Sequence, residues 1–224
     1  MPLSKVKPGI DDNSDATAIT IDSSEQVGIG ATSPRSNLEI SDSSGAELTL
    51  RYTGNSGFAA IKTDGNSALS FSSGATSFTE RMQIDSAGRI TSPNQPRFSI
   101  SGGPNSYKDG SNNQTTVLHG QSGVFSEDVN IGSHFSYTNG RFTAPVAGQY
   151  MFTYTLSTND ADSHFIELRK NGNSVTTILL YGLQYNSGCH STILTLAAND
   201  YVDARRRGTT YDVYSAVFSG YLMG

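Results

Sequence analysis

The sequence has a single cysteine among its 224 residues, Cys189, so the chain cannot form an internal disulfide. It also lacks any run of about 20 apolar residues, the length that a membrane-spanning helix requires. The opening stretch MPLSKVKPGI has no apolar core of the kind that a signal peptide carries, so we expect no export signal there. Stability therefore has to come from buried side chains and, we expect, from association between chains.

Charge is scarce as well, since charged residues make up only 16% of the chain and the net charge is −5. The dense cationic cluster is a run of three arginines, Arg205 to Arg207. A nucleic-acid-binding protein usually spreads many more cations over one face, so we expect no nucleic acid partner. A run of this kind is typical of a solvated turn or of a salt-bridge donor to another subunit.

Motifs of catalysis and metal binding are missing. The chain has no Gly-x-Ser-x-Gly elbow and no Walker loop, and its four histidines lack the spacing of metal ligands. Cys189 and His190 are neighbours on a predicted strand, so their side chains point to opposite faces and cannot pair as nucleophile and base. We expect Cys189 to be a buried small side chain. We predict that the protein is not an enzyme, and a depolymerase with acidic pairs between chains is the weakest alternative.

Glycine, serine and threonine are abundant, with 23 glycines beside only 35% hydrophobic residues. This composition is typical of short strands joined by many turns and argues against a helical bundle. In the first part of the chain the predicted strands are residues 18–22, 26–30, 37–41, 46–52, 58–62, 68–72 and 81–85. Strands this short bury little apolar area in one chain, so we predict an all-β, trimeric shaft in which neighbouring chains complete the core.

The clearest strand pattern follows a turn at Pro145 and Gly148. Proline has no amide hydrogen and ends central strand pairing, and glycine allows the chain to reverse. Beyond the turn Tyr150, Phe152 and Tyr154 occupy alternate positions, which places three rings on one face of a sheet. That face requires a second layer, so we predict a β-sandwich.

Two turn signals mark the organisation of the second half of the chain. The stretch SPNQP, Ser92 to Pro96, gathers two prolines and predicts a linker between domains. Asn171-Gly172, between two apolar segments, predicts a tight hairpin. Ten candidate strands follow the linker, the number that a two-sheet jelly roll uses.

Seven residues of the second half of the chain carry a family resemblance. The residues at the spacing of the family signature are Asn130, Phe135, Phe142, Gly148, Tyr150, Phe152 and Tyr154, whereas its first aromatic position falls on Val124, with Phe125 beside it. The segments Pro96 to Gly103, Leu196 to Gly208 and Val213 to Gly224 resemble the opening strand, the last hairpin but one and the closing strand. The C-terminal half resembles the globular heads of complement-type proteins, which are jelly-roll trimers related to tumour necrosis factor.

The resemblance implies a homotrimer whose interface is built from the central and last strands, here Tyr150, Phe152, Tyr214 and Phe218. Complement-like heads also carry Ca²⁺ near the trimer apex, so Ca²⁺ is a candidate cofactor. In STNDADSH, Asp160 and Asp162 are alternate residues of an extended loop and could present oxygens to one ion. An Asx-rich turn that caps its own backbone explains the same residues.

Three tyrosines near predicted loops, Tyr181, Tyr185 and Tyr211, are candidates to stack on the sugar rings of a host glycan. Most other aromatic side chains of the head are expected in the core or at the trimer interface. This hypothesis gives the head a host-surface ligand as its partner.

A second resemblance concerns the N-terminal half. The segment Ile21 to Pro34 is echoed by Ile84 to Pro93, and both resemble segments that recur in tail-fibre and other virion appendage proteins of bacteriophages, as does the opening MPLSKVKPGIDD. The resemblance implies an anchoring arm over residues 1–18, a shaft over 19–95 and a head over 96–224. In the arm, Leu3, Val6 and Ile10 offer apolar contacts to other virion proteins.

Together the two resemblances predict a non-enzymatic, homotrimeric fibre protein of a phage virion, located on the tail or capsid, whose head attaches to a host-surface ligand. Three equivalent heads would give avidity for a repeated ligand. One alternative is a head fibre, decoration or collar protein with a purely structural role. Another is a secreted trimeric adhesin, which the missing signal peptide disfavours.

Overall fold

The chain is all-β in the computed structural model, which describes residues 19–52, 57–63, 68–102, 116–117, 125–158, 164–180, 187–207 and 213–223. These residues form strands, turns and loops and contain no helix. The chain divides into two compact units, Met1–Pro93 and Asn94–Gly224. The division falls within the segment Ser92 to Pro96 that the proline pattern marks as a linker.

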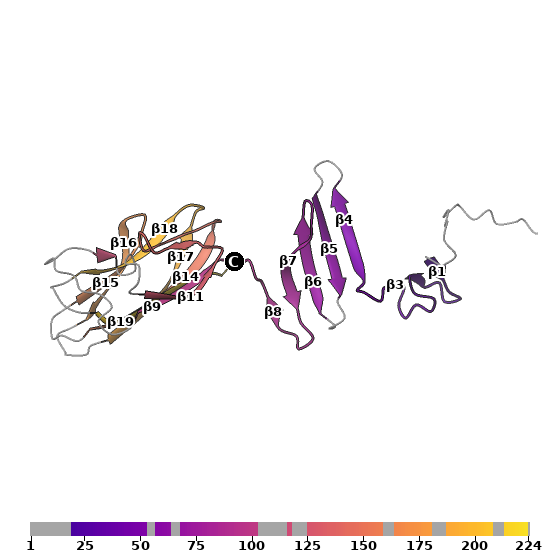
Figure 1. Cartoon of the computed structure of the whole chain (residues 1–224), viewed down its shortest axis with the longest axis horizontal. Helices are drawn as coiled ribbons and strands as arrows, with labels where there is room; N and C mark the ends of the chain where they lie inside the picture. The colour runs from indigo at the N-terminus through magenta and orange to yellow at the C-terminus, as the bar shows by residue number, and fades with distance from the viewer. Residues whose placement is uncertain are drawn as a thin grey trace, which may run out of the picture. The chain divides into compact units, whose positions relative to one another are not determined.

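The first unit contains two separate sheets (Figure 1). One has three strands in the order β1-β2-β3 and the other has five in the order β4-β5-β6-β7-β8. Their bounds are β1 Ile19–Ile21, β2 Val27–Ile29, β3 Leu38–Ile40, β4 Glu47–Tyr52, β5 Gly57–Thr63, β6 Leu69–Gly74, β7 Thr79–Ile84 and β8 Ile90–Thr91. All seven predicted strands are present. The five-stranded sheet is antiparallel and forms within one chain.

The internal echo in the sequence corresponds to one repeated turn. In the β1–β2 hairpin the Asp22 carboxylate accepts hydrogen bonds from the backbone N–H groups of Ser24 and Gln26. In the β7–β8 hairpin the Asp85 carboxylate accepts the equivalent bonds from Ala87 and Arg89. Each aspartate thus satisfies the backbone of its own turn, which is why the same sequence pattern gives the same hairpin twice.

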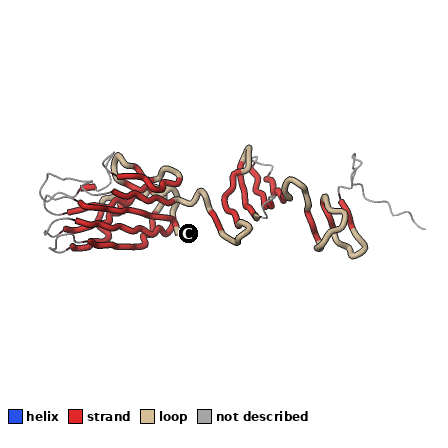
Figure 2. Tube along the Cα trace, turned by 60° about the horizontal axis from the view of Figure 1, so that its bottom comes forward, coloured by secondary structure: helices blue, strands red, loops and turns tan. Residues whose placement is uncertain are grey.

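The second unit is a jelly-roll β-sandwich, as predicted, with two sheets packed face to face (Figure 2). One sheet has the order β11-β9-β19-β14-β17, and the other has the order β12-β13-β18-β15-β16 with β10 paired to β18. The bounds are β9 Arg97–Gly102, β10 Thr116–Val117, β11 Phe125–Ile131, β12 Phe135–Ser136, β13 Arg141–Thr143, β14 Gly148–Thr158, β15 His164–Lys170, β16 Asn173–Leu180, β17 Ser187–Leu196, β18 Tyr201–Arg207 and β19 Val213–Leu222. All ten predicted strands are present, and β11 is an eleventh that the pattern did not indicate.

The core of the sandwich is a cluster of aromatic rings. Phe98 lies at its centre, with ring centroids 5.0 Å from Phe135, 5.0 Å from Phe142 and 4.9 Å from Phe218. Phe142 and Phe218 have no exposed surface, and they come from opposite sheets. Edge-to-face and offset stacking of such rings adds about 0.5–1.5 kcal/mol per pair to the burial of their area.

Two turns between strands are held by residues that the sequence analysis singled out. Asn171 and Gly172 form the predicted hairpin between β15 and β16 with φ angles of 50° and 82°, the left-handed conformations that a two-residue turn needs. Asn130 and Phe135, both of the family signature, are joined by two hydrogen bonds. The Phe135 N–H donates to Asn130 Oδ1, and Asn130 Nδ2 donates to the Phe135 carbonyl, each at 3.0 Å. The asparagine thus holds the β11–β12 turn closed.

Candidate interaction site

Strand β14, between β19 and β17, has one face in the core and one face toward solvent. Tyr150, Phe152 and Phe218 have no exposed surface and pack inside the sandwich of a single chain. The predicted trimer interface therefore does not lie at these three rings, because the face that carries them is already covered by the second sheet. Of the four predicted interface residues only Tyr214 has a substantially exposed side chain, at 41%.

The opposite face of the same strands carries a row of apolar side chains. Met151 of β14 pairs with Ile193 of β17 on one side and with Tyr221 of β19 on the other. Ile193 is 53% exposed and Tyr221 is 47% exposed. The Tyr221 hydroxyl donates a hydrogen bond to Met151 Sδ over 3.2 Å. These three residues, here called the β14 row, form an apolar strip across three neighbouring strands of the sheet.

Smaller groups flank the β14 row along the same face. Thr153 and Ser191 share a hydrogen bond of 2.9 Å between their hydroxyls, one step along the strands. One step further, Thr155 lies between Cys189 and Val217, and both of these side chains are exposed. The face is uncharged at all of these positions, and the charge that the register places beside the β14 row is Arg97 of β9, opposite Tyr221.

Cys189 lies on this exposed face, so the prediction of a buried cysteine is wrong. The alternation of β17 places Cys189 outward and His190 on the other side, where His190 Nε2 lies 2.9 Å from the Thr176 hydroxyl. The two side chains therefore point to opposite faces, as predicted, and they do not form a nucleophile–base pair.

The other sheet carries an ion network on its outer face. The side chain of Asp203 has no exposed area and lies 3.0 Å from Arg205 Nε and 3.4 Å from Arg141 Nε. The guanidinium of Arg141 stacks on the ring of Tyr201, 4.1 Å from its centroid. Arg205 belongs to strand β18, so this part of the arginine run is neither a turn nor a free cation; it pairs within its own chain.

The remaining predicted site residues fall outside the described residues. They are Leu3, Val6 and Ile10 of the arm, the proposed Ca²⁺ ligands Asp160 and Asp162, and the proposed glycan-binding tyrosines Tyr181, Tyr185 and Tyr211. The part of the chain that the structure describes contains no group of three or more His, Cys, Asp or Glu side chains placed to hold a metal ion. Within the same residues no helix is long and apolar enough to cross a membrane.

Fold and site thus define an all-β protein with a jelly-roll head. Residues 108–223 match the C1q domain family, which is more than half of the chain, and the chain belongs to that family. Among curated proteins, Complement C1q tumor necrosis factor-related protein 3 of human and of mouse are each 33% identical over 107 residues. That match covers 45% of this chain and 44% of the relative, so the chain spans less than half the length of these relatives.

Solved structures with a similar fold include the globular domain of zebrafish complement 1qA protein and murine APRIL. The zebrafish domain is 19% identical with a TM-score of 0.44, covering 58% of this chain and 98% of its own. Murine APRIL at pH 8.0 is 9% identical with a TM-score of 0.45, covering 57% of this chain and 99% of its own.

The comparisons confirm the resemblance of the head to complement-type heads and contradict the assignment to a phage virion. The curated relatives are animal proteins of the complement C1q and tumour necrosis factor-related group. The predictions of a phage fibre protein and of a virion location are therefore wrong. They rested on turn-rich N-terminal segments, whose pattern the structure explains by a repeated hairpin turn. The secreted trimeric alternative agrees better with the relatives.

The β14 row was missed from the sequence although a signal for it was present. Met151 occupies the position between Tyr150 and Phe152, so the same alternation that buries these two rings turns Met151 outward. An apolar residue at an outward position of a half-buried strand is the signal for a second interface.

Proposed function

We propose that this chain is a secreted, non-catalytic binding protein that works as a homotrimer through its C1q head. The observation that carries the trimer is the β14 row, Met151, Ile193 and Tyr221, an apolar strip exposed on a folded sandwich. Removing large apolar side chains from water stabilises an association by about 1.5–3 kcal/mol for each that becomes fully buried. Membership of the C1q family supports the same reading.

The interface we propose uses the strands named by the resemblance, β14 and β19, but their outward faces. Each chain then has two apolar layers: the aromatic core inside the sandwich and the β14 row between chains. The Thr153–Ser191 pair on one side of the row is uncharged, so identical chains do not repel each other there, whereas Arg97 on the other side lies at the edge of the proposed contact. Tyr214 is exposed on β19 and belongs to the same strand as Tyr221.

The binding function follows from three copies of one head. A trimer presents three equivalent surfaces, and a ligand repeated on a cell or matrix surface is then held by avidity rather than by one strong contact. We propose a carbohydrate ligand at Tyr181, Tyr185 and Tyr211. Binding of the protein to immobilised polysaccharide that is unchanged when all three tyrosines are replaced by alanine would remove this ligand assignment. Hydrolysis of the polysaccharide would contradict the non-catalytic role.

The experiment that tests the trimer compares two matched substitutions in the full chain. Ile193→Asp places a charge in the β14 row, and Val175→Asp places the same charge at a similarly exposed apolar residue, 43% against 53%, on the other sheet. We expect the mass of Ile193→Asp in light scattering to fall on dilution toward that of one chain, and Val175→Asp to leave the trimer intact at the same dilution. Trimers of Ile193→Asp that resist dilution as well as those of the unmodified chain would contradict the proposed interface. Circular dichroism controls for folding of both variants.

A further inference from the structure

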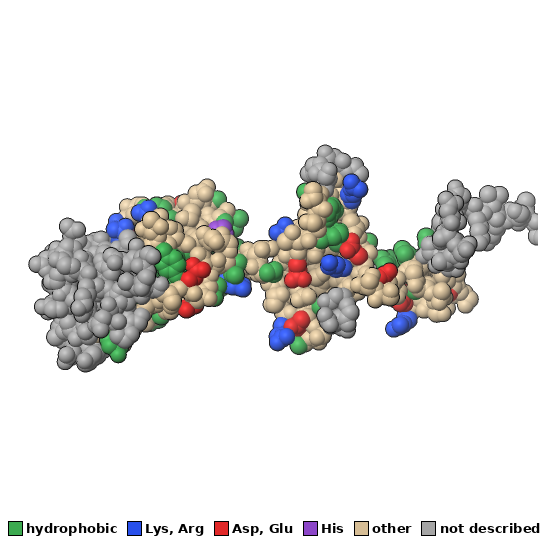
Figure 3. Space-filling model, viewed as in Figure 1, with side chains coloured by type: hydrophobic (Ala, Val, Ile, Leu, Met, Phe, Trp, Pro, Cys, Tyr) green, Lys and Arg blue, Asp and Glu red, His purple; other side chains and the backbone are tan. Residues whose placement is uncertain are grey.

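The five-stranded sheet β4–β8 has its apolar side chains on the exposed face. The register places Leu48 opposite Ile61, Ile61 opposite Phe71, and Phe71 opposite Met82, so one apolar row crosses four strands. A parallel row joins Leu69, Ile84 and Ile90. The apolar face of this sheet comprises Leu48, Leu50, Tyr52, Ile61, Leu69, Phe71, Met82, Ile84 and Ile90. Hydrophobic side chains reach the surface of this sheet in the space-filling view (Figure 3).

The residues that the sheet buries are the small ones on its other face. Ala60, Ser70 and Ser72 are buried, and they alternate with exposed or half-buried Ile61 and Phe71. On that side Phe58 packs edge-to-face on Phe78, with ring centroids 4.4 Å apart. The sheet thus covers its polar face and exposes its apolar one: Leu50 is 62% exposed, Tyr52 68% and Ile90 64%.

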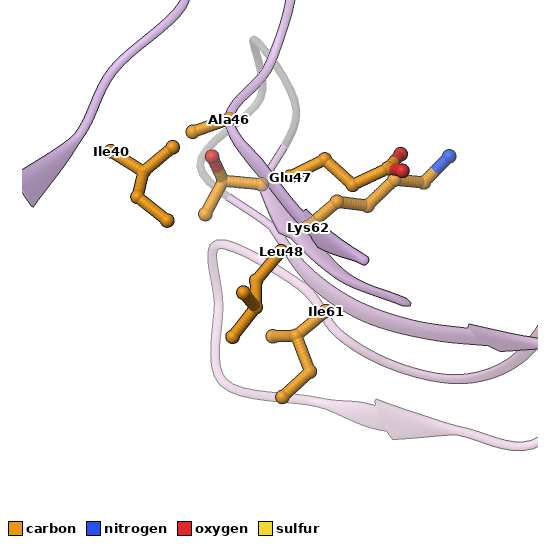
Figure 4. Close-up of a pocket in the computed structure, with 7 residues that line it drawn as sticks. Ile40, Ala46, Glu47, Leu48, Ile61 and Lys62 are labelled. Atoms are coloured by element: carbon orange, nitrogen blue, oxygen red, sulfur yellow. The ribbon is translucent and has the colours of Figure 1, made fainter. Parts of the chain in front are cut away.

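Another segment of the same chain, at the end of strand β3, lies beside one end of this apolar face. A pocket there is lined by Ile40 of β3, by Ala46, and by Leu48 and Ile61, whose side chains converge in Figure 4. Glu47 and Lys62, register partners on the other face, also border the pocket, and their side chains run side by side away from Leu48 and Ile61 (Figure 4). Ile40 covers the rim of the apolar face and leaves Leu50 and Tyr52 exposed.

We propose that this apolar face binds the same face of other copies of this chain, forming a second self-association site separate from the C1q head. A single sheet needs a second layer to be stable. The nine side chains of the face carry no charge, and Glu47, Arg51 and Lys62 lie on the opposite face. The charge nearest to the face is Arg81 at the β-bulge of β7, whose Nε donates a hydrogen bond to the Ser73 hydroxyl over 3.0 Å. Away from Arg81 the face offers a charged partner nothing to pair with.

The short linker between this sheet and the head also favours another copy of this chain as the partner. β8 ends at Thr91 and the first head strand β9 begins at Arg97. Copies held together by their heads therefore keep their sheets within the reach of a few extended residues, about 3.3 Å for each, which raises the effective concentration of one face for another. The gain in effective concentration depends on the proposed head trimer, whereas the exposure of the apolar face does not.

Single-tryptophan reporters in the full chain test the proposal, because the chain contains no tryptophan of its own. Leu50→Trp reports on the apolar face, and Thr49→Trp, one residue away on the polar face, is the matched control. Tyr52→Trp and Arg51→Trp form a second pair should the first disturb folding. We expect the apolar-face reporters to emit at shorter wavelength and to be quenched by acrylamide about threefold less than their controls, as buried side chains are.

Light scattering on the same samples separates the two proposals. A trimer in which both reporters are quenched equally overturns the self-association of the sheet and leaves the head trimer standing. A protected reporter in a monomeric protein, independent of concentration, overturns it as well, because the chain then covers its own face. In the Ile193→Asp background, protection at Leu50→Trp that falls on dilution shows that the sheets associate without the head interface.

Discussion

Tyr221 donates its hydroxyl hydrogen to Met151 Sδ over 3.2 Å, on the solvent side of the sheet whose other side holds the aromatic core. A thioether is a weak acceptor, so the contact orients the ring more than it stabilises the fold. It holds the ring of Tyr221 beside Met151 within the β14 row. The sheet therefore has one apolar layer in the core of its own chain and a second, exposed one, which is the surface we propose for a partner chain.

The first prediction concerns how tightly the core is packed under this sheet. A β-carbon on Gly220 would lie 2.6 Å from Phe152 Cδ1 and 2.8 Å from Phe98 Cε1, and both rings are buried. Gly220→Ala should lower the free energy of unfolding by about 1–3 kcal/mol, the usual cost of overpacking a core. Urea denaturation measures it, with Ser219→Ala on the outward face as the control. Equal midpoints for the two variants would contradict this account of the core.

The second prediction concerns the buried carboxylate of the other sheet. Asp203→Asn removes the charge that faces Arg141 and Arg205 and leaves two guanidinium groups without it. Because these arginine side chains are 33% and 18% exposed, water compensates in part, and we expect a loss of about 1–3 kcal/mol rather than the larger cost of a fully buried pair. The exposed Asp128→Asn is the control. Equal melting temperatures for Asp203→Asn and Asp128→Asn would show that the buried carboxylate contributes no more to stability than an exposed one.

The third prediction is a pH dependence at the turn between β17 and β18. Hydrogen bonds from Asn171, from the Ala197 N–H and from Lys170 lower the pKa of Asp200 from 3.8 to about 2. A lowered folded-state pKa stabilises the protein above the unfolded-state pKa, and that stability is lost as the pH falls through about 2.

Asp200→Asn should therefore melt below the wild-type protein at neutral pH, and the difference should shrink between about pH 4 and pH 2. Thermal melts of both proteins across this range measure it. A difference that stays constant down to the lowest pH would mean that the Asp200 charge has no part in holding the turn.

The fourth prediction compares the two related hairpins of the N-terminal unit. Glu25 has a φ of 62° at the place where the second hairpin has Gly88, with a φ of 79°. Left-handed backbone costs a residue with a β-carbon about 1 kcal/mol, so Glu25→Gly should stabilise the first hairpin and Gly88→Ala should destabilise the second by a similar amount. Hydrogen exchange of the hairpin amides measures both. Shifts of the same sign would contradict the turn analysis.

Local signals in the sequence predicted much of the fold. The alternation at Tyr150, Phe152 and Tyr154 and the turn at Asn171-Gly172 each depend on a few neighbouring residues, and both are present as expected. Strand β11 was missed because Glu127 and Asp128 interrupt its apolar pattern, and its pairing with β9 is set by tertiary contacts. A β-bulge between Glu127 and Val129 absorbs this irregularity.

Three of the four residues predicted for the trimer interface lie on the buried face of their strands. Alternation shows that two faces differ, but which face meets the partner sheet and which meets a partner chain depends on the layer that covers each. The rings of Phe152 and Phe218 are covered within one chain, which leaves Met151 and Tyr221 for an interface. Cys189 was misplaced for the same reason, since its outward position follows from the pairing with Thr155.

The mass of the purified full chain in solution tests the central claim most directly. We predict light scattering to give three times 23.8 kDa, unchanged on dilution, because the β14 row is buried between three copies. A mass of 23.8 kDa at all concentrations would contradict the homotrimer, and with it the interface at Met151, Ile193 and Tyr221 and the avidity on which the binding role depends.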